Sequence, residues 1–284
     1  MRVSTIWQYP VKSMIGVEVP AGELTTTGLV GDRAWAVRDE VRGGIRGAKK
    51  IGELMQFAAR YPGGSAGFDV VEIVLPDGEV ISSADADVAT RLSDALAHHV
   101  TLWPLQPVDD LDHYRRGPAD HADPIDELRQ VFGREADEPF PDFTIFPPEI
   151  MEYESPLGTY LDAFPLLVMT TTALGSLQTA LPDSAIDVRR FRPNIVIDTD
   201  DATDGHPEMQ WVGRQLHIGD VALDVPSACP RCVMVTREVT PDLPADRGVL
   251  RHIVRELDQN VGVYATVSVP GRISVGDQVS VTSA

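Results

Sequence analysis

Both cysteines of this chain lie in one tetrapeptide, Cys229-Pro230-Arg231-Cys232. Two thiols in 284 residues are too few for the disulfide framework of a small secreted protein. The C-x-x-C spacing suits a redox dithiol, half of a zinc site, a local disulfide, or one thiolate that binds a soft metal. A pair of incidental buried cysteines is a further alternative, so the surrounding sequence has to decide.

The residues beside the pair argue against two of these uses. A thioredoxin-like pair opens a helix, whose dipole lowers the thiol pKa. Here Asp224-Val225-Pro226 precedes the pair and Val233-Met234-Val235-Thr236 follows it, which predicts strand, loop and strand. None of the 7 histidines forms a pair at zinc-finger spacing. A local disulfide, a single soft-metal ligand and the incidental pair remain open.

Cationic residues stand beside small polar ones at three other places. Lys12 and Ser13 follow the first strand-like segment, and Arg33 follows a glycine-aspartate turn. Arg192 and Asn194 flank a proline, which predicts extended backbone at the arginine. Guanidinium, ammonium, hydroxyl and amide groups together can hold a phosphate. The alternative is that each cation forms a separate surface ion pair.

Composition excludes several classes of protein. The formal net charge of -19 argues against nonspecific binding to nucleic acid or anionic membranes, both of which require basic surface. The chain has no phosphate-binding glycine loop, no dinucleotide glycine fingerprint and no nucleophile elbow. We find neither a signal segment nor an apolar run of the roughly 20 residues that a bilayer requires. We therefore expect a cytoplasmic protein.

Many short strands and few helices must position these residues. We predict the following strands: Arg2–Gln8, Glu18–Thr25, Arg33–Arg38, Phe68–Leu75, Gly78–Ile81, Leu166–Thr170, Asn194–Asp198, Gln210–Val212, Gln215–Ile218, Val221–Val225 and Val233–Glu238. We predict helices at 84–97, 125–132, 171–181 (capped by Thr171 or Thr172) and 250–257.

The predicted fold class is α+β, mainly β, with two packed β-barrel-like domains and a few helices. Residues 1–105 form the first unit and 156–284 the second. Residues 106–155 are rich in Asp, Glu and Pro, and we interpret them as an acidic linker or insertion.

Five short motifs in a fixed order resemble a known family. They are Tyr9-Pro10-Val11-Lys12-Ser13, Gly31-Asp32-Arg33-Ala34-Trp35, Phe191-Arg192-Pro193-Asn194, Cys229-Pro230-Arg231-Cys232 and Gly271-Arg272-Ile273-Ser274-Val275-Gly276-Asp277. The set resembles the MOSC superfamily (molybdenum cofactor sulfurase C-terminal domain) with its N-terminal β-barrel domain. Within it, the motifs are most similar to the branch of the mitochondrial amidoxime-reducing component and its bacterial relatives.

The resemblance implies a molybdenum cofactor held between the two units. It makes Cys232 the metal-binding thiolate and Cys229 a neighbour. The residues that match the family's anchors for the phosphate end of the cofactor are Lys12, Ser13, Arg33, Arg192 and Asn194. Asp162 matches a family acidic residue that could supply a proton, although a capping role is an equal alternative. Ala163 and Phe164 stand where relatives have a hydroxyl pair, so those cofactor contacts are expected to be missing.

The resemblance also implies an activity, the reduction of N-hydroxylated small molecules (amidoximes, hydroxylamines, N-hydroxylated bases) by oxygen-atom abstraction at the metal. With no cysteines to spare we expect no iron–sulfur cluster in this chain, so a separate ferredoxin- or flavoprotein-type reductase would supply electrons. An alternative is a cofactor carrier or a sulfur-transfer protein that uses a Cys232 persulfide. A third possibility is a β scaffold without a cofactor.

Overall fold

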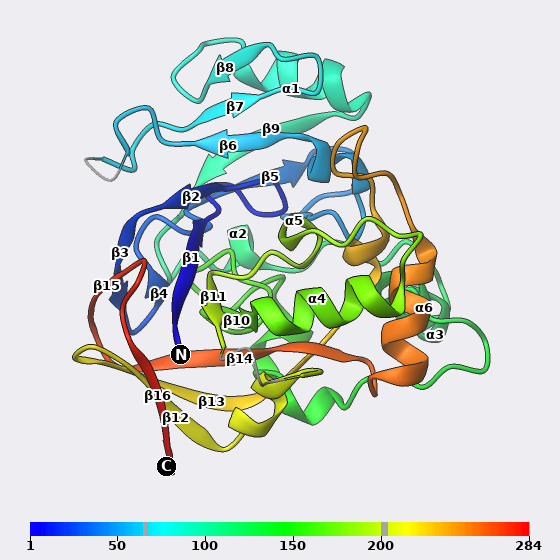
Figure 1. Ribbon diagram of the computed structural model, residues 1–284. Helices are drawn as coiled ribbons and strands as arrows, with labels where there is room; N and C mark the ends of the chain where they lie inside the picture. Colours follow the sequence, from blue (N-terminus) through cyan, green and yellow to red (C-terminus); the bar gives the residue numbers. More distant parts are fainter. Residues whose placement is uncertain (65–66, 200–203, 284) are drawn as a thin grey trace.

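The computed structural model of the protein describes residues 1–64, 67–199 and 204–283. In these residues the strands form sheets of eight, three, two and three strands, with helices packed around them (Figure 1). A mixed composition of strands and helices is therefore confirmed. No sheet among the described residues was found to close on itself, so the barrel-like form of the two units stays a prediction.

The first part of the chain is mostly short strands. Its elements are β1 (Arg2–Gln8), β2 (Val17–Val19), β3 (Ala21–Thr25), β4 (Gly28–Leu29), β5 (Trp35–Asp39), η1 (Gly52–Gln56), β6 (Ala58–Arg60), β7 (Glu72–Val74), β8 (Val80–Ser82), α1 (Val88–Leu96) and β9 (Val100–Pro104). The predicted strand at the N-terminus is confirmed over its whole length.

The remainder alternates short helices with longer strands. Its elements are α2 (Leu111–Tyr114), α3 (Pro124–Phe132), η3 (Phe143–Ile145), η4 (Pro148–Met151), β10 (Leu166–Thr170), α4 (Thr171–Ala180), α5 (Val188–Phe191), β11 (Ile195–Asp198), η5 (Pro207–Trp211), β12 (Arg214–Ile218), β13 (Val221–Pro230), η6 (Val233–Thr236), α6 (Arg247–Glu256), β14 (Asn260–Val269), β15 (Gly271–Ser274) and β16 (Val279–Ser283). None of the helices in the described part has the length and apolar character needed to cross a membrane.

The eight-stranded sheet joins both halves of the chain. Its order is β16-β12-β13-β14-β10-β11-β1-β2, so the N-terminal strand β1 pairs with β11. In return, β15 near the C-terminus pairs with β3 (Figure 1). All five residues of β10 are buried because it lies between β14 and β11 in the interior of the sheet. The two halves are therefore interleaved through backbone hydrogen bonds.

Two predicted strands are wrong. Residues predicted as the strands Gln210–Val212 and Val233–Glu238 instead form the 3₁₀ helices η5 and η6. A short apolar run alone does not distinguish a strand from one buried helical turn, and tertiary packing decides. Cys229 lies near the end of β13, and Cys232 is the residue directly before η6, so a strand end and a short helix hold the two cysteines. Met234 of η6 packs into the hydrophobic core of the N-terminal half.

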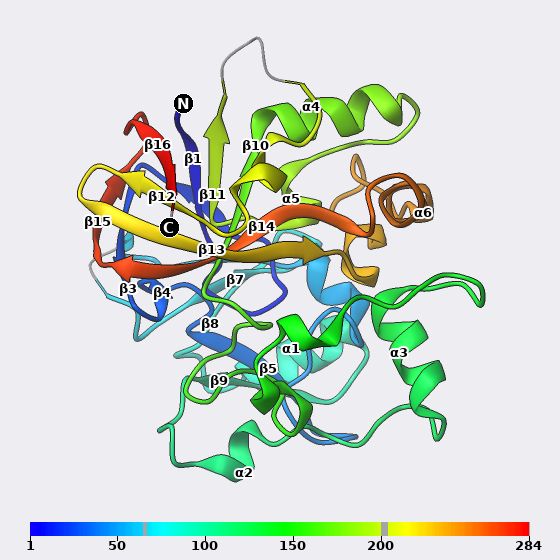
Figure 2. The same cartoon turned by 90° about the horizontal axis from the view of Figure 1, so that it is seen from below.

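The predicted linker is ordered into several elements. Residues 106–155 include α2, α3, η3 and η4, and they run along the outside of the molecule before the chain enters β10 (Figure 2). Helix α3 has a full set of end signals, because Asp123 accepts a hydrogen bond from the backbone of Ile125 and Gly133 ends it with φ 61°. The domain boundaries themselves stay a prediction.

Candidate functional site

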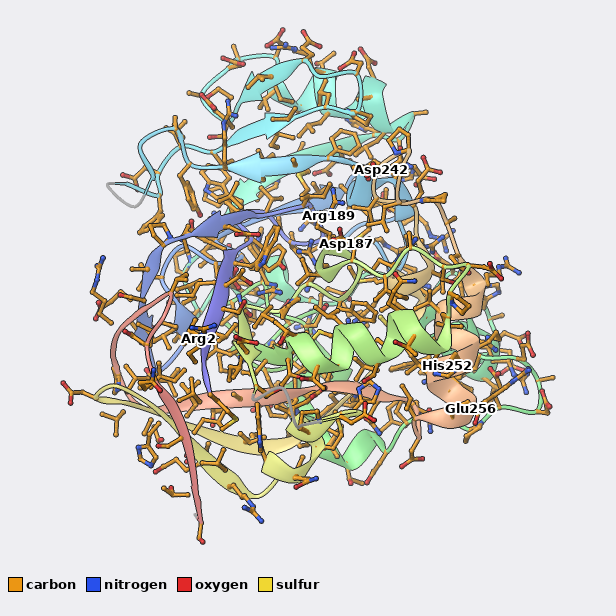
Figure 3. The ribbon with its side chains drawn as sticks, in the orientation of Figure 1. Arg2, Asp187, Arg189, Asp242, His252 and Glu256 are labelled. Atoms are coloured by element: carbon orange, nitrogen blue, oxygen red, sulfur yellow. The ribbon has the colours of Figure 1, made fainter. Side chains whose placement is uncertain are left out.

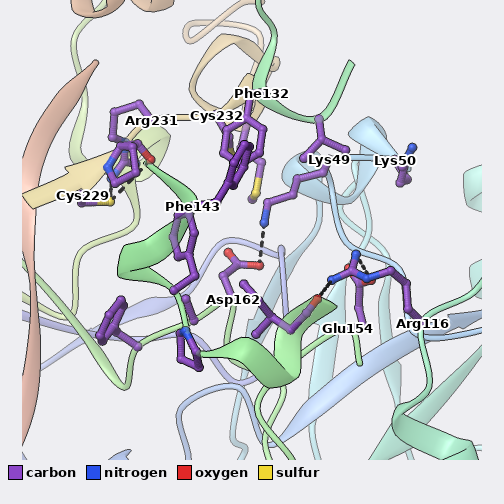
Figure 4. A pocket seen from close by; sticks show the side chains of 18 of the residues that line it. Lys49, Lys50, Arg116, Phe132, Phe143, Glu154, Asp162, Cys229, Arg231 and Cys232 are labelled. Carbon is purple, nitrogen blue, oxygen red and sulfur yellow. Dashed lines mark hydrogen bonds and ion pairs between the residues drawn. The ribbon is translucent and has the colours of Figure 1, made fainter. Parts of the chain in front are cut away.

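A cavity of about 690 Å³ lies where the two halves and the 106–155 segment meet. The cysteine loop, the turn at Asp162, the end of α5 and the loop that contains Lys49 all contribute side chains to it (Figure 4). Of the predicted site residues, the cavity is lined by Arg33, Asp162, Arg192, Asn194 and Cys232. Residues that are more than 190 positions apart in the sequence thus share one cavity.

The two thiols have different surroundings. Cys229 lies in β13, is only 4% exposed, and accepts a hydrogen bond from Nη1 of Arg231 at 3.2 Å. Burial raises the pKa of the Cys229 thiol, which therefore stays neutral. Cys232 is half-buried and directs its sulfur toward Lys49 and Asp162 (Figure 4). Only Cys232 therefore presents an accessible sulfur beside charged groups.

Arg192 has a left-handed backbone conformation and a buried guanidinium group. It ends α5 with φ 61°, so the predicted extended backbone is wrong. The following proline disfavours the right-handed helical region, which the left-handed conformation avoids. The guanidinium carbon lies 4.3 Å from the centre of the Tyr9 ring, and Nη1 donates to the backbone oxygen of Met14. Nη2 is buried, and no partner for it is found among the described residues. Burial lowers the pKa of Arg192 to about 10, so the side chain remains cationic at neutral pH.

Arg33 and Asn194 lie beside this guanidinium. Arg33 forms an ion pair with the buried Asp32 and lies 5.1 Å above the same Tyr9 ring. The Asn194 side-chain oxygen accepts hydrogen bonds from the backbone of Leu167 at 3.3 Å and from Arg33 at 3.4 Å. These contacts fix two guanidinium groups and one amide at one end of the cavity.

Lys12 and Ser13 do not line the cavity formed by the described residues. The Lys12 ammonium is buried, and it donates to the backbone oxygens of Tyr160 at 2.9 Å and Leu161 at 3.2 Å and to Asp162 at 3.0 Å. The hydroxyl of Ser13 accepts a hydrogen bond from the backbone of Ala48 at 2.9 Å. In this structure both residues position the backbone next to the cavity, and their role as cofactor anchors stays a prediction.

Asp162 is held between two ammonium groups. Lys12 lies 3.0 Å and Lys49 3.3 Å from the same carboxylate oxygen. Burial alone would raise the pKa of Asp162, but Lys12 and Lys49 hold it well below its usual value. Conversely, burial would lower the pKa of Lys49, whereas Asp162 and Cys232 raise it. At neutral pH the pair is therefore carboxylate and ammonium.

Lys49 was missed by the sequence reasoning. Residues 42–47 are rich in glycine and arginine, and the two lysines shortly after them are the signal that could have indicated it. The structure separates their roles, because Lys50 pairs with Asp120 at 2.9 Å and with Glu127, whereas Lys49 extends into the cavity (Figure 4).

Apolar side chains replace the hydroxyl pair that the family resemblance predicts before β10. Ala163 is buried, and Phe164 stacks on Tyr264 with ring centres 4.6 Å apart and an interplanar angle of 25°. Both line the cavity, but neither side chain offers a hydrogen bond. The absence of those polar contacts to the cofactor stays a prediction.

The donor set fits a phosphate-bearing metal cofactor. In the part of the chain that the structure describes, the buried Nη2 of Arg192 has no hydrogen-bond partner, and a phosphate oxygen would satisfy it. Arg33, Lys49 and Arg231 add positive charge in a protein whose net charge is -19. Cys232 supplies one soft ligand, which suits a metal that carries its other ligands with it.

The chain belongs to the MOSC family. Residues 158–280 match the MOSC domain, and residues 1–113 match the MOSC N-terminal beta barrel domain. The chain is 27% identical over 302 residues to "Mitochondrial amidoxime reducing component 2" of Bos taurus, which covers 98% of this chain and 82% of the relative. It is 26% identical over 310 residues to "Mitochondrial amidoxime-reducing component 1" of Homo sapiens, with the same shares covered. A solved structure, the YUAD protein from Bacillus subtilis, is 10% identical with a TM-score of 0.45 and aligns over 100% of this chain and 96% of its own.

Proposed function

We propose that this chain is an oxidoreductase that reduces N-hydroxylated small molecules with a molybdenum cofactor bound in the central cavity. The observation that carries the proposal is the presence of the accessible Cys232 sulfur and the incompletely bonded Arg192 guanidinium in one cavity. The full-length similarity to proteins named as amidoxime reducing components supports the class of substrate. Amidoximes, hydroxylamines and N-hydroxylated bases share the N–O bond that would be cleaved.

The protein's part is to bind and orient. Arg33, Arg192 and Asn194 would hold the anionic end of the cofactor through charge-assisted hydrogen bonds. Cys232 would hold the metal, and its neighbour Cys229 stays a neutral, buried thiol. When bound, the molybdenum supplies two-electron oxygen-atom abstraction from an N–O bond. Overall, the substrate gains two electrons and two protons, the N–O bond breaks, and water leaves.

Lys49 and Asp162 would act on the substrate side. As an ammonium held by Asp162, Lys49 can donate a hydrogen bond to the oxygen of the N–O group. The low pKa of Asp162 leaves it ionised near neutral pH. We therefore assign Asp162 to positioning Lys49, in place of the proton supply that the sequence resemblance had suggested.

The two electrons would come from a separate ferredoxin- or flavoprotein-type reductase. The chain has 2 cysteines, and Cys229 is buried while Cys232 is assigned to the metal, so neither is available for an iron–sulfur cluster. A net charge of -19 favours a donor whose docking face is basic.

The test compares two cysteine variants made in a host that synthesises the cofactor. Cys232→Ser is expected to lose bound molybdenum and all reduction of benzamidoxime by reduced methyl viologen. Cys229→Ser is the matched control, and it is expected to keep molybdenum near the wild-type level. Elemental analysis and the formation of benzamidine measure the two effects separately.

Two results would overturn the proposal. If Cys232→Ser retains molybdenum at the wild-type level, the ligand assignment is wrong. If the wild-type protein binds the metal but reduces no N-hydroxylated compound with any donor, the reductase assignment is wrong and a cofactor carrier explains the binding.

A further inference from the structure

The cavity has a second, apolar face that the polar site does not use. Six side chains form it, and together we call them the apolar wall: Leu128, Val131, Phe132, Phe143, Phe146 and Met151. All six lie in the segment between the two ranges that match the family, 1–113 and 158–280. The wall therefore lies in the segment that neither family domain covers.

The wall is not part of a hydrophobic core. None of the residues of α3 is buried, and the centre of the Phe143 ring lies 5.5 Å from Phe132 and 6.4 Å from Phe146. Phe143 is 38% exposed and Met151 is 78% exposed. A cluster of aromatic side chains that remains accessible beside a cavity is typical of a binding surface.

Buried and partly buried arginines hold the wall against the cysteine loop. Nη2 of Arg134 donates to the backbone oxygen of Arg231 at 3.1 Å and to the side-chain oxygen of Gln259 at 2.9 Å. Arg251 of α6 pairs with Glu138 and donates to the backbone oxygen of Gly133. These contacts hold the end of α3 next to the cysteine loop, and Phe132 and Phe143 line the cavity on the same side as Cys232 (Figure 4). A surface held in this way can select a ligand by shape.

The cationic end of the cavity and the apolar wall suit ligands of different charge. An anionic cofactor gains hydrogen bonds at the cationic end, near Arg33 and Arg192, and would gain none at the wall. An uncharged planar or aliphatic body gains burial and ring stacking at the wall. The part of the cavity beside the wall therefore suits the body of the substrate, with its polar head toward Lys49.

We propose that the apolar wall determines substrate specificity, favouring N-hydroxylated compounds with an aromatic or bulky apolar body over small polar ones. This inference rests on the proposed reductase function for the reaction, but binding of the substrate body can be tested without turnover. Phe143 is the central contact, because it touches both neighbouring rings and stands half exposed at the cavity.

The binding experiment uses two neutral amides that differ only in the body, benzamide and acetamide, with the full chain and calorimetry. Wild type should bind benzamide about tenfold more tightly than acetamide, since stacking and burial of one ring amount to at least one factor of ten. Phe143→Ala should remove most of this preference, and Phe143→Leu should keep part of it. Phe140→Ala is the matched control. The centre of the Phe140 ring lies 6.3 Å from that of Phe143, but Phe140 does not line the cavity.

The kinetic experiment compares benzamidoxime with acetamidoxime. Phe143→Ala should raise KM for benzamidoxime about tenfold and leave KM for acetamidoxime and kcat unchanged.

Equal binding of the two amides by wild type, or an unchanged preference for benzamide in Phe143→Ala, would overturn the inference. The inference would also be overturned if Phe143→Ala changed only the KM for a protein electron donor, because the wall would then be a docking surface for that donor. A protein that binds benzamide at the wall but reduces nothing would overturn the reductase proposal and leave binding at the wall intact.

Discussion

Arg192 combines a strained backbone with an incompletely bonded side chain. A non-glycine residue at φ 61° costs free energy, on the order of 1–3 kcal/mol when nothing offsets it. Here the conformation ends α5 and turns the guanidinium over Tyr9, toward the cavity. Strain of this kind concentrates at functional sites. This conformation supports the proposed role of Arg192 in holding the phosphate end of the cofactor.

Replacing Arg192 by Lys should weaken cofactor retention although the positive charge remains. Lysine lacks the planar fork, so it cannot both donate to Met14 and present a second donor to a phosphate oxygen. Loss of one charge-assisted hydrogen bond predicts roughly tenfold lower retention of molybdenum after dialysis. The measurement is metal per chain.

The matched control is Arg189→Lys, on the same short helix. Arg189 pairs with Asp187 at 2.8 Å (Figure 3) and is not among the residues that line the cavity. Molybdenum content should be unchanged in this variant. Equal losses in the two variants would show that α5 itself is sensitive, and would remove the special role of Arg192.

At the scale of residues, the sequence predicted the polar face of the site better than the apolar one. Arg33, Arg192, Asn194 and Cys232 all reach the cavity, because motif residues at turns and strand ends are fixed by local backbone. Lys12 was predicted as a ligand contact from its place beside Ser13 and from the family resemblance, whereas its hydrogen bonds go to backbone oxygens that only the fold brings near. The apolar wall depends on how the middle segment packs, which periodicity does not reveal.

At the scale of elements, burial decided which predictions were confirmed. Strand β10 is confirmed at both ends, since five consecutive apolar or small residues between two strands permit one arrangement. The similar run at Val233–Thr236 becomes a 3₁₀ helix, because Met234 and Val235 pack into different cores. The cap of α4 was predicted at Thr171 or Thr172, but Thr170 accepts the capping hydrogen bond from Ala173.

Thr170→Ala should destabilise the protein by about 1–2 kcal/mol, the usual cost of a lost helix cap. The Thr170 hydroxyl accepts from the backbone of Ala173 at 3.0 Å and donates to the fully buried Glu208 at 2.8 Å. Both partners would lose a hydrogen bond in the variant. Chemical denaturation gives the change in the free energy of unfolding. Thr171→Ala is the comparison, with a half-buried hydroxyl that donates to Asp198, and it should cost less; the reverse order would refute the assignment of the cap.

At the scale of the whole molecule, the two units predicted along the sequence are not physically separate in the fold. Composition alone predicted a first and a second unit, and family matches cover 1–113 and 158–280. Yet β1 pairs with β11, and β15 pairs with β3, so each unit supplies strands to the other. Long-range register of this kind depends on packing of both halves, which no local pattern specifies. The cavity lies at this shared boundary, and its geometry therefore requires both halves.

Interleaving predicts that the two halves unfold together. Ile6 in β1 is fully buried in the core of the large sheet, and truncation of such a residue to alanine costs about 2–5 kcal/mol. Ile6→Ala should therefore lower the denaturant midpoint equally for β7 in the first half and for β13 in the second. Hydrogen exchange at increasing urea concentration measures both segments in one experiment.

Val41→Ala is the control, since Val41 is 63% exposed, and it should leave both midpoints unchanged. If β7 keeps its protection at urea concentrations where β13 has lost it, the halves fold independently, and the shared strands contribute little to cooperativity.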